Sequence, residues 1–117
     1  MDIDEAIKTH LTWKAAFRTA IAARSKIDLT LVGNDQACAL GHWLHGEAEH
    51  LYPRLHSYWD CVIAHSELHL EANRIARLIS QGKYEEAQVA LERGTPYSAA
   101  SNKIIVALKL FEAEARL

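Results

Sequence analysis

The chain has 117 residues, a mass of 13.1 kDa and a formal net charge of −2 at pH 7. This length predicts a single domain, residues 1–117, with a core of its own. The lack of a basic surplus argues against nucleic acid as a partner, because excess lysine and arginine neutralise phosphates. Two cysteines are too few for a disulfide framework and fit a reducing cytoplasm. The chain contains no run of about 18 apolar residues, so the sequence does not predict a membrane span.

Apolar residues recur at helical spacing along the chain, which contains only five glycines and two prolines. The first helix is expected over residues 3–24, because one face of that segment is apolar apart from His10 and the intruding Lys14. The Gly-Asn-Asp sequence at residues 33–35 then predicts a turn. Its asparagine or aspartate would cap a short helix over residues 36–45.

A long helix is expected over residues 51–80, with Pro53 in its first turn, where a missing N–H is tolerated. A glycine just beyond residue 80 predicts its end. A short helix over residues 83–93 follows, and Thr95-Pro96 is typical of the N-cap and first position of a last helix ending near residue 116. Three long and two short helices with short connections predict an all-α fold, an antiparallel helical bundle.

The segment "CVIAHSELH" places Cys61, His65 and His69 one turn apart on one face of the long helix. Steps of about 100° per residue put both histidines in the predicted core stripe. The same reasoning turns His10 inward on the first helix. Buried imidazoles need polar partners, so these histidines either are satisfied core residues or share a metal ion. Spacing alone leaves both interpretations open.

A closed zinc site has four ligands, and Cys38, His42, His45 and Cys61 are the candidates for the fourth. Cys38 begins the short helix, whose N-terminus favours the thiolate form that binds metal. The apolar side of this helix would press Cys38 toward the bundle and leave His42 and His45 nearer the rim. Geometry therefore favours Cys38 without deciding the matter.

Three motifs in this order are similar to a known family. They are "THLTWK" at residues 9–14, "CALGHWL" at residues 38–44 and "HSELH" at residues 65–69. The chain resembles the chemoreceptor zinc-binding (CZB) domain, whose pattern is H-x-x-W, then C-x-x-G-x-W followed by a hydrophobic residue, then H-x-x-x-H. Each motif is weak alone, but three in the same order and spacing are specific, and the resemblance spans nearly the whole chain.

The resemblance implies that His10, Cys38, His65 and His69 bind one Zn²⁺. It also implies a bacterial, cytoplasmic sensor that forms homodimers and regulates a chemoreceptor or a diguanylate cyclase. Such a domain responds to zinc or to oxidants such as hypochlorous acid and is not an enzyme. Because the chain shows no receptor or cyclase segment, we expect either a free-standing member or a domain separated from its output.

The sequence leaves two alternatives to a zinc sensor. A metal-dependent helical-bundle enzyme or oxygen carrier would need an open metal site, and a purely structural dimerisation bundle would bind no zinc.

Cys61 is either a small core residue or a thiol that pairs with oxidised Cys38. Apolar residues on the far side of the long helix and off the core stripe of the last helix predict a homodimer contact: Tyr52, Trp59, Ile63, Leu70, Ile105, Val106 and Leu110. The sequence also predicts solvent-facing histidines at His42, His45, His50 and His56, solvated carboxylates at Glu67 and Glu71, and packing roles for Trp13 and Trp43.

Overall fold

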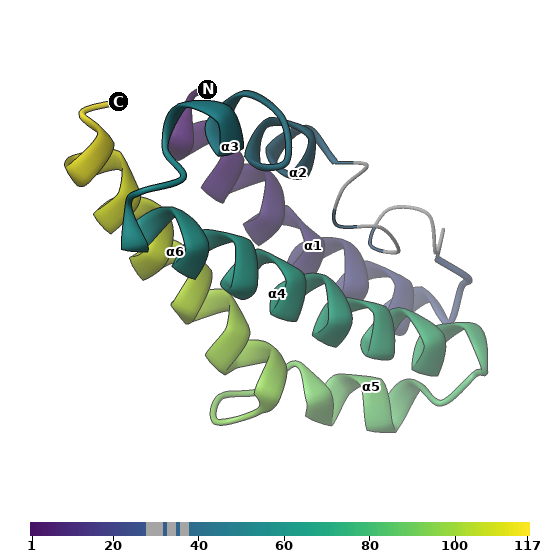
Figure 1. The fold of residues 1–117 in the computed structure, drawn as a ribbon. Helices are drawn as coiled ribbons and strands as arrows, with labels where there is room; N and C mark the ends of the chain where they lie inside the picture. Colours follow the sequence, from purple (N-terminus) through teal and green to yellow (C-terminus); the bar gives the residue numbers. More distant parts are fainter. Residues whose placement is uncertain (28–31, 33–34, 36–37) are drawn as a thin grey trace.

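A computed structural model describes residues 1–27, 32, 35 and 38–117. These residues form six helices and no strand, so the all-α prediction is confirmed (Figure 1). The helices are α1 (Ile3–Ala23), α2 (Ala39–Leu44), α3 (Glu47–Leu51), α4 (His56–Ser80), α5 (Tyr84–Ala90) and α6 (Pro96–Ala115). No helix in the described part of the chain is long and apolar enough to cross a membrane.

The ends of the long helices follow local sequence signals. The side chain of Asp2 accepts a hydrogen bond from the Glu5 N–H and caps α1, and Thr95 caps α6 in the same way. Gly82 follows α4 with a φ of 74°, which is the left-handed conformation of a glycine C-terminal cap. Gly94, with a φ of 78°, separates α5 from α6. The predicted boundaries of α1 and α6 therefore hold to within a residue.

The directions of the helices are visible in three contacts between their ends. Lys109 near the end of α6 forms a salt bridge with Asp4 at the start of α1, and Ser57 at the start of α4 donates a hydrogen bond to Glu114 of α6. At the opposite end, the Tyr84 hydroxyl donates to the carbonyl of residue 24. Helix α6 thus runs antiparallel to α1 and α4, whereas α1 and α4 point the same way (Figure 1).

The prediction of one long helix over residues 51–80 is wrong at its start. Residues 47–51 form the separate helix α3, and α4 begins only at His56. Pro53 lies in the turn between them, because its ring disfavours the helical conformation of the preceding residue. The indole of Trp59 donates a hydrogen bond to the Pro53 carbonyl at 2.9 Å and holds this turn against the first turn of α4.

The second helix, α2, is also shorter than predicted. It begins at Ala39 and not near residue 36, and its N-cap is Cys38, whose sulfur accepts a hydrogen bond from the Gly41 N–H at 3.3 Å. Residues 36 and 37 and the predicted cap Asn34 lie outside the described residues. Leu40 and Leu44 of α2 are fully buried, so this six-residue helix is held against the bundle by its apolar side.

Candidate metal centre

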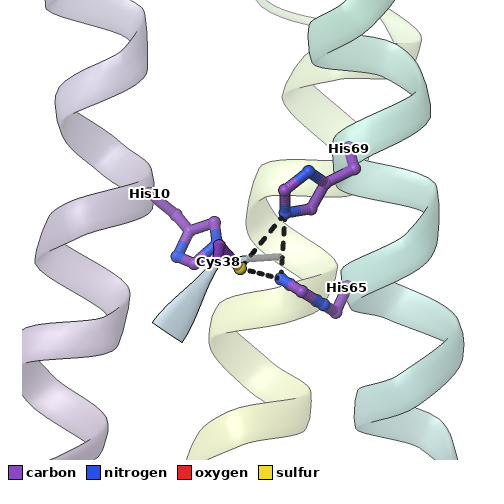
Figure 2. A group of neighbouring side chains, drawn as sticks. All are labelled: His10, Cys38, His65 and His69. Carbon is purple, nitrogen blue, oxygen red and sulfur yellow. Dashed lines mark hydrogen bonds between the residues drawn. The ribbon is translucent and has the colours of Figure 1, made fainter. Parts of the chain in front are cut away.

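Four side chains from three parts of the fold meet at one point, as Figure 2 shows. One donor atom from each of His10, Cys38, His65 and His69 lies within 4.8 Å of every other. The Cys38 sulfur is 3.2 Å from His65 Nε2, 3.5 Å from His69 Nε2 and 3.9 Å from His10 Nε2. The Nε2 atoms of His65 and His69 are 3.0 Å apart. The structure brings together the four residues singled out from the sequence.

The geometry follows from how each helix is packed. His65 and His69 are one turn apart on α4, so their rings project from the same face. His10 faces them from the buried side of α1, and Cys38 comes from the start of α2 (Figure 2). The hydroxyl of the buried Tyr58 donates to the Leu44 carbonyl at 2.7 Å and fixes the other end of α2 on α4.

Backbone carbonyls orient two of the three imidazoles. His10 Nδ1 lies 2.8 Å from the carbonyl of Ala6, and His69 Nδ1 lies 3.0 Å from the carbonyl of Val32. Because a carbonyl oxygen can only accept, each Nδ1 carries the proton and each Nε2 presents a lone pair to the cluster. This is the arrangement of metal-binding histidines, whose second nitrogen is held by a hydrogen bond.

The donor set fits a tetrahedral ion of the size of Zn²⁺. Zn–N distances of about 2.0–2.1 Å and Zn–S distances of about 2.3 Å place neighbouring donor atoms roughly 3.3–3.6 Å apart. The closest separations here, between 3.0 and 3.9 Å, bracket that range. The imidazole lone pairs that face one another in this largely buried site repel, and a cation at their centre removes that repulsion. Nitrogen and thiolate donors are the ligands that zinc prefers.

Burial keeps the imidazoles neutral. It is the main cause that lowers the pKa of His65 to about 3, and the neighbouring His69 and His10 add to the effect. Burial also lowers the pKa of His10 and His69. Neutral imidazole is the form that binds metal, so these ligands need not lose a proton at pH 7.

The Cys38 thiol differs from the prediction. Burial raises its pKa, and the N–H groups of Gly41 and Leu40 offset only part of that rise. The helix N-terminus therefore does not produce a free thiolate by itself, because α2 is short and the sulfur is half-buried. A metal ion bound here would have to displace the thiol proton.

Cys61 lies outside the cluster. Its side chain is fully buried, and its S–H donates to the Ala107 carbonyl of α6 at 3.1 Å. Burial raises the pKa of this thiol to about 12. A thiol that is protonated, bonded and enclosed is a poor ligand and a poor nucleophile. The interpretation of Cys61 as a small core residue is therefore the better one.

The aromatic residues near the site have different roles. Trp13 packs against both His10 and His69, with ring centroids 4.7 and 4.9 Å apart, and supports the metal side of α1. Trp43 instead packs against Phe111 of α6 and holds α2 in place from the other side.

The remaining polar residues mostly follow the prediction. His42, His50 and His56 are exposed. Glu67 and Glu71 pair with Lys103 and Arg74, and the side chain of Glu71 is less solvated than predicted, at 16% exposure. His45 departs from the prediction, since it is half-buried and its Nε2 is enclosed without a hydrogen-bond partner. The position of His45 at the end of α2 carries no periodic signal from which its burial could be predicted.

Comparison with protein families identifies this constellation. The model of the chemoreceptor zinc-binding domain matches residues 10–76, which is more than half of the chain and includes all four cluster residues. The chain belongs to the CZB family. Neither the comparison with curated proteins nor that with solved structures gave a match. The name of the CZB family matches the chemistry of the three nitrogens and one sulfur.

Proposed function

We propose that the chain is a regulatory sensor of the CZB family in which His10, Cys38, His65 and His69 bind one Zn²⁺. The convergence of four donor atoms within 4.8 Å carries this proposal. Zinc bound there would supply a structural cross-link between segments far apart in the sequence. Three neutral imidazoles and one thiolate leave the site with a net charge of about +1, an acceptable charge for a buried centre.

The site supports regulation better than catalysis. Four protein donors complete a tetrahedral shell, and hydrolysis needs a fourth position left for water. Oxygen carriers built on helical bundles use carboxylates, and the four-residue cluster contains none. We therefore infer that residues 1–117 act as one sensor domain without an enzymatic activity of their own.

We assign the switch to Cys38. Cys38 is the half-buried ligand and is the N-cap of the six-residue helix α2. It also borders a cavity of about 310 Å³ that touches His10 and Trp13. A small oxidant such as hypochlorous acid fits such a cavity. The thiolate would give two electrons to the chlorine, which leaves as chloride, and the sulfur would take the oxygen as a sulfenic acid. That sulfur is a weaker zinc ligand, so α2 would be released from α1 and α4.

The output is proposed to be a bacterial cytoplasmic signalling protein, either a chemoreceptor or a diguanylate cyclase. Membership of a chemoreceptor zinc-binding family supports this class of partner. The net charge of −2 supports neither nucleic acid nor an anionic membrane surface as the partner.

We further propose that the domain is a homodimer through α4 and α6. Trp59 and Ile63 of α4 and Val106 and Leu110 of α6 expose between 43 and 68% of their surface. Three of them line or border a groove of about 610 Å³ that also holds Asp60 and Lys103. A twofold axis would bury these apolar side chains against their copies and bring each carboxylate toward an ammonium group of the partner.

Tyr52 and Ile105, also predicted at this contact, have other environments. Tyr52 precedes α4 and packs against Phe111, and Ile105 is half-buried against the core. The exposed Leu70, further along α4, extends the proposed surface.

Zinc content and zinc affinity test the sensor. Protein purified without added metal should hold one zinc per chain, and Cys38→Ala should lower the affinity by at least about 100-fold while Cys61→Ala leaves it unchanged. Hypochlorous acid should release zinc from the wild-type protein and from Cys61→Ala, as measured with a zinc-sensitive dye. Unchanged affinity and unchanged release in Cys38→Ala would refute the assignment of Cys38.

Sedimentation tests the dimer. The wild-type protein should sediment as a dimer at micromolar concentration, and Val106→Asp should convert it to a monomer with unchanged helical content. Glu86→Asp, a charge-conserving change on α5 away from the groove, serves as the control. A monomeric wild-type protein at micromolar concentration would contradict the proposal.

A further inference from the structure

Two buried nitrogen atoms near the metal centre have no hydrogen-bond partner. Among the described residues, His65 Nδ1 and His45 Nε2 are the enclosed side-chain atoms in this condition. Buried polar groups are almost always paired, so each such atom calls for a physical reason. His45 is the C-cap of α2, and His65 lies on α4, to which the end of α2 is bonded through Tyr58 and Leu44.

The three histidines of the cluster are not held alike. His10 and His69 each give their Nδ1 proton to a backbone carbonyl, at 2.8 and 3.0 Å. His65 faces Cys38 and His69 through Nε2, so its Nδ1 must carry the proton when Nε2 binds metal. This N–H therefore needs an acceptor that the backbone does not provide.

The packing of α2 brings a suitable acceptor to this place. Tyr58 lies two turns before His65 on α4, and its hydroxyl binds the carbonyl of Leu44. His45 is the next residue and is the C-cap of α2, so it directly follows the point where α2 is bonded to α4. The pKa of His65 is lowered by burial first, then by His69, His10 and lastly His45, which agrees with a position of His45 near this ring. An imidazole nitrogen with a free lone pair is a good acceptor.

We propose that His45 is a positioning residue for the metal centre, and that one bound water molecule links its Nε2 to the Nδ1–H group of His65. The water would accept from His65 and donate to His45, which satisfies both enclosed nitrogens. The bridge would fix the tautomer and the ring orientation of His65, as the two carbonyls do for its fellow ligands. It would also couple the end of α2 to the ligand on α4.

This inference rests on the proposed zinc binding and has its own test. His45→Phe keeps a ring but removes the acceptor, and should weaken zinc binding by about 10- to 100-fold in a chelator competition. His45→Gln places an amide group close to the position of Nε2 and should restore most of the affinity. His42→Phe, on the exposed side of the same helix, is the matched control and should bind zinc like the wild-type protein.

A second measurement reads the hydrogen bond itself. In the zinc-loaded wild-type protein with ¹⁵N-labelled histidine, His65 should show a ring Nδ1 proton that exchanges slowly with water. That signal should move or exchange faster in His45→Gln, which substitutes a different acceptor. If His45→Phe does not fold, as judged by circular dichroism, the exchange rate and position of the His65 ring proton in His45→Gln decide.

The outcomes separate this inference from the function it rests on. Zinc binding by the wild-type protein together with equal affinity in His45→Phe would overturn the role of His45 alone. A His65 ring proton that is indifferent to substitution of His45 would do the same. A wild-type protein without affinity for zinc would overturn both the proposed sensor and this role.

Discussion

The metal-free protein should lose stability steeply as the pH falls below neutrality. His10, His65 and His69 are at most 5% exposed, and burial lowers the pKa of each. In the unfolded chain the same imidazoles titrate near the ordinary value of about 6.5. Below that pH the unfolded chain binds more protons than the folded chain, so the free energy of unfolding falls with pH. The stability is fully present above the unfolded pKa and is lost toward the folded one.

The size of the effect follows from the pKa of about 3 for His65. Between pH 8 and pH 5 this residue alone removes about 2 kcal/mol of stability, since each pKa unit is worth about 1.4 kcal/mol. Burial also lowers the pKa of His10 and His69, so both residues add to this loss in the same direction. A domain of this size is stable by about 5–15 kcal/mol, so this loss is a measurable fraction of the stability of the metal-free form at pH 5.

Urea denaturation at a series of pH values measures this loss directly. The chelator-treated protein should show a midpoint that falls between pH 7 and pH 5. The slope of the free energy of unfolding against pH is proportional to the number of protons taken up on unfolding. His65→Gln should reduce that slope by about one proton. The exposed His42→Gln should leave it unchanged. A stability independent of pH between 8 and 5 would refute the buried, neutral state of these ligands.

Three further changes probe the neighbourhood of the site. Zinc binding at pH 7 should release one proton, from Cys38, because burial raises the pKa of this thiol while the histidine ligands are already neutral. Calorimetry in buffers of different ionisation enthalpy counts the released protons. A release of two protons would contradict the assignment. Cys61→Ala should cost about 1–2 kcal/mol in urea denaturation, through the lost contact with the Ala107 carbonyl, without changing zinc affinity. Tyr58→Phe should leave the Leu44 carbonyl unpaired, cost about 1–3 kcal/mol and speed zinc release to a chelator, whereas an unchanged release rate would mean that α2 is held by its apolar contacts alone.

The metal ligands were predictable from the sequence to the extent that they obey helical periodicity. His65 and His69 are one turn apart, and His10 sits in an apolar stripe, so local geometry alone turns all three inward. Cys38 was harder, because its place depends on how the chain returns from the end of α1. The order of three motifs, compared with a family pattern, supplied what periodicity could not.

The failures have a common physical origin in ambiguous local signals. Pro53 suits either the first turn of a helix or the turn before one, and only the packing of Tyr52 and Trp59 selects the second. Counting helical steps back through that turn placed Tyr52 on a face of α4 to which it does not belong. The sequence predicts a solvent-facing His45 because the end of a short helix has no period from which burial can be calculated.

Helix α4 connects the two surfaces to which we assign functions. One side carries His65 and His69, and the other exposes Trp59 and Ile63. Because both surfaces belong to α4, a shift of this helix on zinc binding would also move the residues on its other side. If zinc alters the affinity of one copy for another, dimer formation must alter zinc affinity by the same factor. The hydrogen bond from the Cys61 S–H to the Ala107 carbonyl joins α4 to α6, the two helices of the proposed interface. This contact is a structural role for a buried cysteine that takes no part in the metal site.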